Sequence, residues 1–245
     1  MTLVLMVLTC ACLVFYALLF MIRPARSEKD LAPLLQFRYA HRGLYGQYSS
    51  RENTYEAFTD AIASGYGIEL DVQLSADGTA VISHDRTLKR LFGIDHAIED
   101  MSDEALAFLP TLKQTLLLVN GEVPLIIELK HYGDIYRTCK EVYKLLKPYQ
   151  GPYAIESFHP LMLRWFLHNA PDVPRGQLLS RSWQLLFHCF SRPDIAVCKL
   201  GMEKALLLRF FKRICCPVTV AWTVRTGEEH LIAQAYYDTE IFESY

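Results

Sequence analysis

Short apolar runs alternate with helical patterns along most of the chain after residue 36. The apolar runs are typical of buried strands and lie at 37–40, 67–73, 79–83, 124–129, 153–157, 176–179, 194–198, 217–223 and 239–243. The helical patterns lie between them, at 53–64, 102–108, 134–147, 160–169, 183–189, 203–212 and 228–236. This alternation predicts an α/β fold of parallel strands with helical crossovers. About eight such units fit a compact (β/α)8 barrel, and a doubly wound open sheet fits the same pattern.

The helix predicted over 53–64 has the clearest boundaries. Asn53 is a suitable N-cap, Glu56 follows three residues later, and Gly65 stands where the helix should end. We therefore expect Asn53 to cap this helix.

Residues 2–22 form an uncharged, mostly apolar run ahead of these elements. A helix of this length extends over about 31 Å, close to the hydrocarbon thickness of a bilayer. The run therefore predicts one N-terminal transmembrane helix. The alternatives are a buried core helix, which normally shows a polar stripe, and a cleaved signal peptide, which has basic residues before the run and a cleavage site after it.

Basic residues follow this run but do not precede it, at Arg23, Arg26 and Lys29. Positive charge beside a membrane span favours the cytoplasmic side. The sequence thus predicts a single-pass membrane protein whose main domain lies in the cytoplasm. The predicted organisation is a membrane anchor over 2–22, a linker over 23–35 and a barrel domain over 36–245.

The composition excludes several classes of protein. Hydrophobic residues make up 51% of the chain and charged residues 21%, which excludes a disordered chain. A net charge of −2, without any Lys/Arg-rich run, argues against nucleic acid as a partner. The seven cysteines show no zinc-binding spacing, and reduced thiols agree with a cytoplasmic domain.

Polar residues gather at the ends of four predicted strands. They are His41, Arg42, Glu69, Asp71, His84, Glu128 and Lys130. The carboxyl ends of parallel strands form one rim, and ligands bind at that rim in α/β folds. We therefore expect these side chains to meet at one site.

Three of these residues are carboxylates on apolar strands. Glu69 and Asp71 are two residues apart, so both side chains point to one face of their strand, and Glu128 lies on another strand. Buried carboxylates need a positive partner, which is either a basic side chain such as Arg42 or Lys130, or a metal ion. Oxygen ligands suit hard cations, so the three residues predict one divalent ion, Mg²⁺ or Ca²⁺.

His41 and His84 are the natural acid–base pair, because imidazole titrates near neutral pH. Arg42 and Lys130 would hold an anionic group, most simply a phosphate. A divalent cation, two histidines and two basic side chains together predict phosphoester chemistry.

The order of these motifs resembles the glycerophosphodiester phosphodiesterase family. The matching elements are HRG at 41–43, ENT at 52–54, ELDVQ at 69–73, HD at 84–85, ELK at 128–130 and the later tryptophan strand VAWTVR at 220–225. HRG alone is a weak signal, whereas the ordered set is highly specific. The similarity runs from about residue 37 to the C-terminus.

This resemblance implies a TIM barrel of the phosphatidylinositol-phospholipase-C-like type. It implies that His41 and His84 are the general acid and base, that Glu69, Asp71 and Glu128 ligate the metal, and that Arg42 contacts the phosphate with Lys130 near it. Glu52 and Asn53 lie in a matching motif without an assigned role. The implied reaction cleaves a glycerophosphodiester into glycerol 3-phosphate and an alcohol.

Some questions stay open in the sequence. Arg225 stands where the family usually has Asn, and either adds a cation to the rim or is plain surface charge. Trp222 either contacts the substrate or packs in the core. The predicted anchor makes lysophospholipids or other lipid-derived diesters an alternative substrate class. A catalytically silent, membrane-bound interaction module is a second alternative, and the complete set of site residues argues against it.

Overall fold

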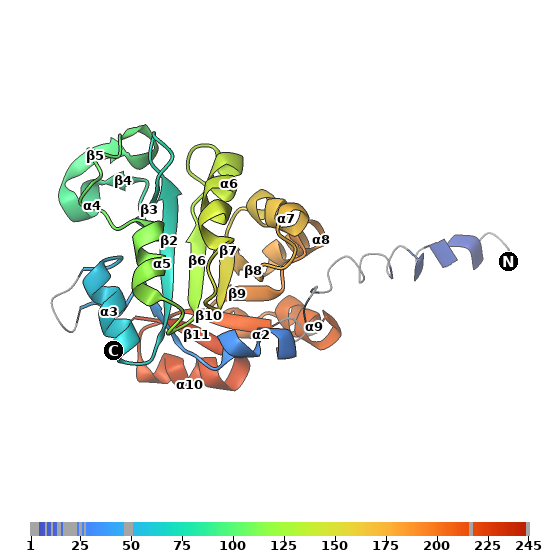
Figure 1. Cartoon of the computed structure of the whole chain (residues 1–245). Coiled ribbons are helices and arrows are strands. Elements are labelled where there is room, and N and C mark those ends of the chain that lie inside the picture. The colour runs from blue at the N-terminus through green and yellow to red at the C-terminus, as the bar shows by residue number, and fades with distance from the viewer. Residues whose placement is uncertain are drawn as a thin grey trace.

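Eight parallel strands close into a barrel in the computed structural model, which describes residues 5–7, 9–10, 12–13, 16, 24, 26, 28–46, 51–215 and 218–243. In barrel order they are β1 (Tyr39–His41), β2 (Gly67–Leu74), β6 (Leu125–Leu129), β7 (Tyr153–Ser157), β8 (Arg175–Leu179), β9 (Ile195–Lys199), β10 (Val218–Val224) and β11 (Thr239–Phe242). Strand β1 pairs in parallel with both β2 and β11, which closes the ring (Figure 1). The predicted (β/α)8 barrel is therefore confirmed, and a doubly wound open sheet is excluded.

Helices cover the outside of the barrel. They are α3 (Tyr55–Ala63), α5 (Leu112–Val119), α6 (Ile135–Leu146), α7 (Pro160–Asn169), α8 (His188–Ser191), α9 (Leu206–Cys215) and α10 (Gly227–Tyr236), with short 3-10 turns η2 (Ser182–Phe187) and η3 (Met202–Lys204). The strand residues that face these helices are apolar and fully buried, as Ile68, Leu70 and Ile127 show. Because strand side chains alternate, the residues between them point into the barrel.

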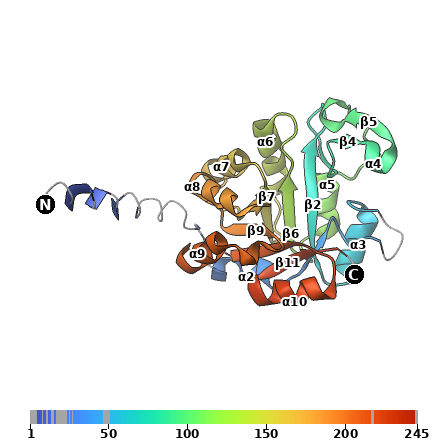
Figure 2. The same ribbon diagram turned by 180° about the vertical axis from the view of Figure 1, so that it is seen from behind.

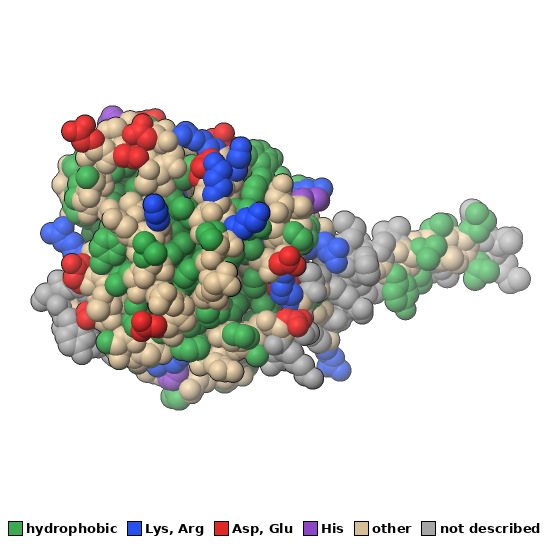
Figure 3. Space-filling view, viewed as in Figure 1, with side chains coloured by type: hydrophobic (Ala, Val, Ile, Leu, Met, Phe, Trp, Pro, Cys, Tyr) green, Lys and Arg blue, Asp and Glu red, His purple; other side chains and the backbone are tan. Residues whose placement is uncertain are grey.

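The run predicted as a strand over 79–83 does not belong to the barrel wall. Strand β3 (Ala80–Ile82) pairs antiparallel with the last residues of β2. The chain then makes a small excursion through β4 (Thr87–Leu88), α4 (Lys89–Phe92), β5 (Ile94–Ala97) and the 3-10 turn η1 (Ile98–Asp100). The excursion lies at the end of the barrel where the strands finish (Figure 1), and acidic side chains gather over it in Figure 3.

The helix predicted over 102–108 is wrong, because these residues form turns and the helix is α5, further along the chain. Thr111 caps α5 by accepting a hydrogen bond from the backbone N–H of Gln114. Leu106 and Leu109 are buried against Leu88 and Ile98 of the excursion. Their helix-like spacing therefore reflects packing of a loop against this small cluster.

An apolar floor closes the other end of the barrel. Helix α2 (Glu28–Leu35) lies below the beginnings of the strands (Figures 1 and 2), and its Leu31 packs in one cluster with Tyr39, Ile126 and Val197 from inside the barrel. The second half of the predicted linker 23–35 is thus a helix that packs on the barrel. We propose that the barrel domain begins at residue 28.

The predicted membrane anchor over 2–22 lies mostly outside the described residues, which include only 5–7, 9–10, 12–13 and 16 of that run. Within the part of the chain that the structure describes, no helix is long and apolar enough to cross a membrane. The prediction of a single-pass membrane protein with a cytoplasmic domain is therefore wrong.

Candidate active site

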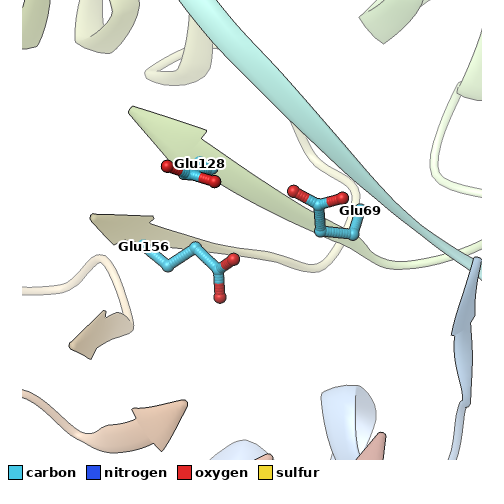
Figure 4. Close-up of side chains that lie close together, drawn as sticks. All are labelled: Glu69, Glu128 and Glu156. Carbon is cyan, nitrogen blue, oxygen red and sulfur yellow. The ribbon is translucent and has the colours of Figure 1, made fainter. Parts of the chain in front are cut away.

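Three glutamates from neighbouring strands form the upper layer of the barrel interior. Glu69 comes from β2, Glu128 from β6 and Glu156 from β7, and Glu128 pairs in register with Glu156. One carboxylate oxygen of each lies within 4.8 Å of the others (Figure 4). Two residues earlier in β6 and β7, the inward positions are Ile126 and Ala154, which belong to the apolar floor. The three carboxylates therefore lie above the apolar floor, towards the end of the barrel where the strands finish.

Burial and mutual repulsion disfavour the charged form of these glutamates. Burial is the main cause that raises the pKa of Glu69 and Glu156 well above the usual value, and neighbouring carboxylates add to it. Burial also raises the pKa of Glu128 to about 7, although Lys130 opposes the shift. The three carboxylates supply oxygen donors and negative charge that a hard divalent cation would neutralise. The residues present therefore fit such an ion.

Asp71, which the sequence predicts as a ligand, lies beside Glu128 and is also bound by basic side chains. Its carboxylate pairs with Lys130 Nζ at 2.7 Å and Arg42 Nε at 3.3 Å, and it accepts a hydrogen bond from Asn53 Nδ2 at 2.8 Å. Burial raises the pKa of Asp71, but Lys130, His84 and Arg42 together outweigh it and hold that pKa far below the usual value. Asp71 thus has the basic partners that the sequence names as one alternative, and its role as a metal ligand stays a prediction.

Glu156 takes the third place in the cluster and is absent from the sequence-based prediction. Its signal is present in the sequence, because the strands LIIEL and YAIES each carry a glutamate just before the strand ends. Parallel pairing places these two glutamates at one height on the same side of the sheet. Recognising it requires knowing that β6 and β7 are neighbours.

Asn53 does not cap its helix as predicted. Thr54 is the N-cap of α3, and its hydroxyl accepts from the backbone N–H of Ala57. Asn53 has a left-handed backbone with φ 55°, and its N–H donates to the carbonyl of Arg42, which is also left-handed with φ 58°. Two non-glycine residues held in this region mark a locally constrained turn, a feature that clusters at functional sites. The side chain of Asn53 binds the carboxylate of Asp71 instead of the helix.

His41 is oriented by a carboxylate at the end of the chain. Its Nδ1 lies 2.9 Å from Glu243 Oε1, and its Nε2 lies 3.9 Å from Glu69 Oε2. A carboxylate only accepts, so Nδ1 carries the proton and Nε2 faces the acidic cluster. Arg225 Nε in turn donates to Glu243 Oε2 at 2.7 Å, which makes Arg225 the outer member of the chain Arg225–Glu243–His41. Burial lowers the pKa of His41, and the Glu243 hydrogen bond opposes it.

His84 is held in the same way from the other side. Its Nδ1 lies 2.7 Å from Asp85 Oδ1, and Arg90 Nε donates to the second oxygen of Asp85 at 2.6 Å. The side-chain amide of Gln73 donates to the carbonyls of Ser83 and Asp85 at 2.8 and 2.9 Å, so the backbone is fixed on both sides of the histidine. Burial lowers the pKa of His84 as well.

Glu52 links Arg90 to the other half of the site. Arg42 Nη1 donates to Glu52 Oε1 at 2.9 Å, and Arg90 Nη1 donates to Glu52 Oε2 at 3.1 Å. The glutamate of the ENT motif is therefore a bridge between the two arginines, a role that its sequence pattern left unassigned.

A cavity of about 110 Å³ lies between these groups. Its lining includes His41, His84, Glu69, Glu128, Glu156, Arg42, Arg225 and Trp222. The structure thus brings together most residues that the sequence predicts for the site. Trp222 packs edge-on against Phe158 and donates from Nε1 to the carbonyl of Val197 at 3.2 Å. Lys130 does not line the cavity, because Asp71 and Glu128 hold its ammonium group.

Comparison with known proteins identifies the family. The family model described as "Glycerophosphoryl diester phosphodiesterase family" matches residues 41–199, from the first histidine to the end of β9, which is well over half of the chain. The chain belongs to the glycerophosphoryl diester phosphodiesterase family.

Curated relatives of this family member include bacterial and mammalian enzymes. The chain is 35% identical to a glycerophosphodiester phosphodiesterase from Bacillus altitudinis over 55% of its own length and 63% of the relative. It is 33% identical to one from Caldanaerobacter subterraneus over 57% of its length and 65% of the relative. A mouse lysophospholipase D is 34% identical over 42% of this chain and 30% of that protein. The chain thus spans less than two thirds of the length of these relatives.

Solved structures match a larger share of this family member than the curated relatives do. A glycerophosphodiester phosphodiesterase from Thermotoga maritima superimposes with a TM-score of 0.71 at 27% identity, covering 84% of this chain and 94% of that one. A phosphodiesterase from Oleispira antarctica, in complex with sn-glycerol-3-phosphate, has a TM-score of 0.73 at 23% identity and covers 83% of this chain and 91% of that one. The second likeness supports the barrel fold alone.

Proposed function

We propose that this protein is a metal-dependent glycerophosphodiester phosphodiesterase that releases glycerol 3-phosphate and an alcohol. One observation carries the proposal: His41 and His84 line one small cavity beside a cluster of buried carboxylates, and each has its Nδ1 bound to a carboxylate. Family membership and the named relatives support the same reaction class.

The two histidines act as general base and general acid. With Nδ1 donating to Glu243 or Asp85, the neutral imidazole offers Nε2 as an acceptor towards the cavity. One histidine removes the proton of the attacking hydroxyl, either of the substrate's own glycerol or of water, and the other protonates the leaving alkoxide. Attack by the substrate's own hydroxyl gives a cyclic phosphate, which water then opens.

The glutamates supply the electrostatic half of the reaction. Glu69 and Glu128 would hold a divalent cation, which neutralises the phosphate charge and lowers the pKa of the attacking hydroxyl. The backbone N–H of Arg42 fixes Glu69 by donating to its Oε2 at 3.0 Å. Asp71, predicted as a ligand, acts here by holding Lys130 and Arg42 in place.

Basic and aromatic side chains position the substrate. Arg42 lines the cavity and would contact the phosphate. Lys130 contributes positive charge from behind Asp71 and Glu128 rather than by direct contact. Trp222 presents its ring to the cavity and would pack against the glycerol or the leaving group.

Hydrolysis assays test this proposal directly. The full chain is incubated with glycerophosphocholine, glycerophosphoglycerol and a lysophospholipid, first with chelator and then with Mg²⁺ or Ca²⁺ restored. We expect glycerol 3-phosphate from the glycerophosphodiesters, lost in chelator and recovered with metal. Full turnover in chelator would remove the metal from the mechanism, and no turnover of any substrate would favour a silent interaction module.

The lysophospholipid arm addresses the second candidate function. A mouse lysophospholipase D is among the relatives, which favours a lipid diester as an alternative substrate. Faster release of the phosphorylated product from the lysophospholipid than from glycerophosphocholine would move the proposal to that class.

A further inference from the structure

We propose that Glu156 is an additional carboxylate ligand of a calcium ion, together with Glu69 and Glu128. This inference rests on the metal site of the proposed function and deepens it, because it names a new ligand and chooses the ion.

The position of Glu156 points to a ligand. Its side chain is 3% exposed, projects from β7 into the barrel, and faces the carboxylates of Glu69 and Glu128 (Figure 4). Its Oε2 is buried without any hydrogen-bond partner among the described residues. A buried carboxylate oxygen without a donor costs free energy that a bound cation would recover. The oxygen is therefore both aimed at the cluster and available to it.

The charges around the cluster leave Glu156 unbalanced. The ammonium group of Lys130 is shared by Asp71 and Glu128, at 2.7 and 2.8 Å. Arg42 is paired with Glu52 and Asp71. In the described part of the chain, both basic residues that are packed behind the cluster are thus engaged by other carboxylates. Two added positive charges would balance the glutamates that remain.

The donor set favours calcium over magnesium. Three protein carboxylates meet here, whereas magnesium usually keeps several waters and binds one or two carboxylates. The ligand oxygens lie within 4.8 Å of one another, a spread that two bonds of about 2.3–2.6 Å to calcium can bridge.

Metal binding by the full chain tests the proposal without an activity assay. Chelator-treated wild type and Glu156→Gln are titrated with CaCl2 and, separately, MgCl2, with isothermal calorimetry and thermal unfolding as readouts. We expect wild type to bind Ca²⁺ more tightly than Mg²⁺, and Glu156→Gln to lose about 10–100-fold or more in Ca²⁺ affinity. The metal-free variant should unfold at a higher temperature than metal-free wild type, since it lacks one unbalanced buried charge.

Glu203→Gln is the matched control. Glu203 is another buried glutamate, but its Oε2 already accepts from the backbone N–H of Gly201 at 2.7 Å and from the Tyr237 hydroxyl at 3.1 Å. This variant should keep the Ca²⁺ affinity of wild type. If Glu156→Gln does not fold, Glu156→Asp retains the charge but shortens the reach, and should bind Ca²⁺ more weakly than wild type.

The outcomes separate this inference from the proposed function. Wild-type Ca²⁺ affinity in Glu156→Gln or Glu156→Asp would overturn the role of Glu156 and leave the proposed reaction untouched. Equal or tighter binding of Mg²⁺ by wild type would overturn the choice of calcium. Absence of any metal binding by wild type would overturn the inference, and the hydrolysis assay in chelator then decides whether the reaction itself survives.

Discussion

The carboxylate of Glu243 accepts a hydrogen bond from Nδ1 of His41 at 2.9 Å, and its other oxygen accepts one from Arg225 Nε at 2.7 Å. The histidine is thereby fixed in one tautomer, with its second nitrogen directed to the cavity. Glu243 does not line that cavity, so it acts through His41 and not on the substrate. Arg225, which replaces the usual Asn of the family, gains a role in this arrangement as the outer support.

Replacing Glu243 should therefore impair turnover more than binding. In Glu243→Gln the amide can donate to Nδ1 and favour the wrong tautomer of His41. We expect kcat to fall by about 10²–10⁴-fold, the range for loss of a general acid or base, with KM close to wild type. Steady-state kinetics with glycerophosphocholine measures both. The exposed Glu228→Gln on α10 is the control, and a change confined to KM would contradict a positioning role.

The carboxyl group of Glu243 should also make the Tm of the protein depend on pH in acid solution. The hydrogen bond from His41 is the main cause that lowers the pKa of Glu243 from 4.5 to about 2. A carboxyl with a lower pKa in the folded state adds stability above the unfolded value, and this stability is lost as the pH falls towards 2. The Tm difference between wild type and Glu243→Gln should thus shrink as the pH falls below 4.5. A difference that stays constant in thermal melts across this window would rule out the linkage.

Each histidine should be needed separately for turnover. His41→Ala and His84→Ala should each lower kcat by about 10²–10⁴-fold, because each removes one proton-transfer group. Thermal unfolding of His84→Ala should change little, since His84 lies at the rim, whereas His41→Ala also loses the hydrogen bond to Glu243 and should unfold at a lower temperature. His96→Ala, an exposed histidine on β5, is the matched control. If either alanine variant keeps most of the wild-type kcat, the histidine that it replaces is not a catalytic group.

Asp71 should behave as a structural residue when it is neutralised. Asp71→Asn leaves the buried ammonium of Lys130 with one carboxylate fewer and weakens the pairing of Arg42. Breaking a buried ion pair by removing one partner costs about 3–5 kcal/mol of the free energy of unfolding. Urea unfolding of the metal-free protein measures this loss. Unchanged stability combined with lost metal affinity would instead return Asp71 to the ligand set.

The alternation of strands and helices was predictable because its signal is local, whereas the choice of a closed barrel over an open sheet came from the family resemblance. LIIEL, for example, is a short apolar run with one glutamate, which is typical of a buried strand; in the structure Leu125, Ile127 and Leu129 pack on the helix side while Ile126 belongs to the apolar floor. The two histidines and Glu69 were predictable for the same reason, since each ends or follows an apolar run. The ordered motifs then carried these positions to one family.

The parts that sequence reasoning missed depend on contacts between distant segments. Glu243 reaches His41 across 202 residues, and only closure of β11 onto β1 makes them neighbours. Asn53 has the composition of a cap, but the carboxylate of Asp71 competes for its side chain, and Thr54 caps the helix instead. The ion pair of Asp71 with Lys130 is likewise a tertiary contact, and the role of Asp71 as a metal ligand stays a prediction.

The antiparallel strand β3 divides the catalytic pair between two parts of the fold. His41 ends a strand of the closed barrel, whereas His84 follows a three-residue strand outside the ring, which pairs with the projecting end of β2 and bridges to Thr111. Peripheral segments of this kind open more easily than a closed barrel and often form separate cooperative units. Mild denaturant should therefore abolish hydrolysis before the barrel unfolds, with amide exchange appearing first at residues 80–100. The two histidines thus depend on parts of the fold with different stability, so the protein can lose its acid–base pair while the barrel stays intact.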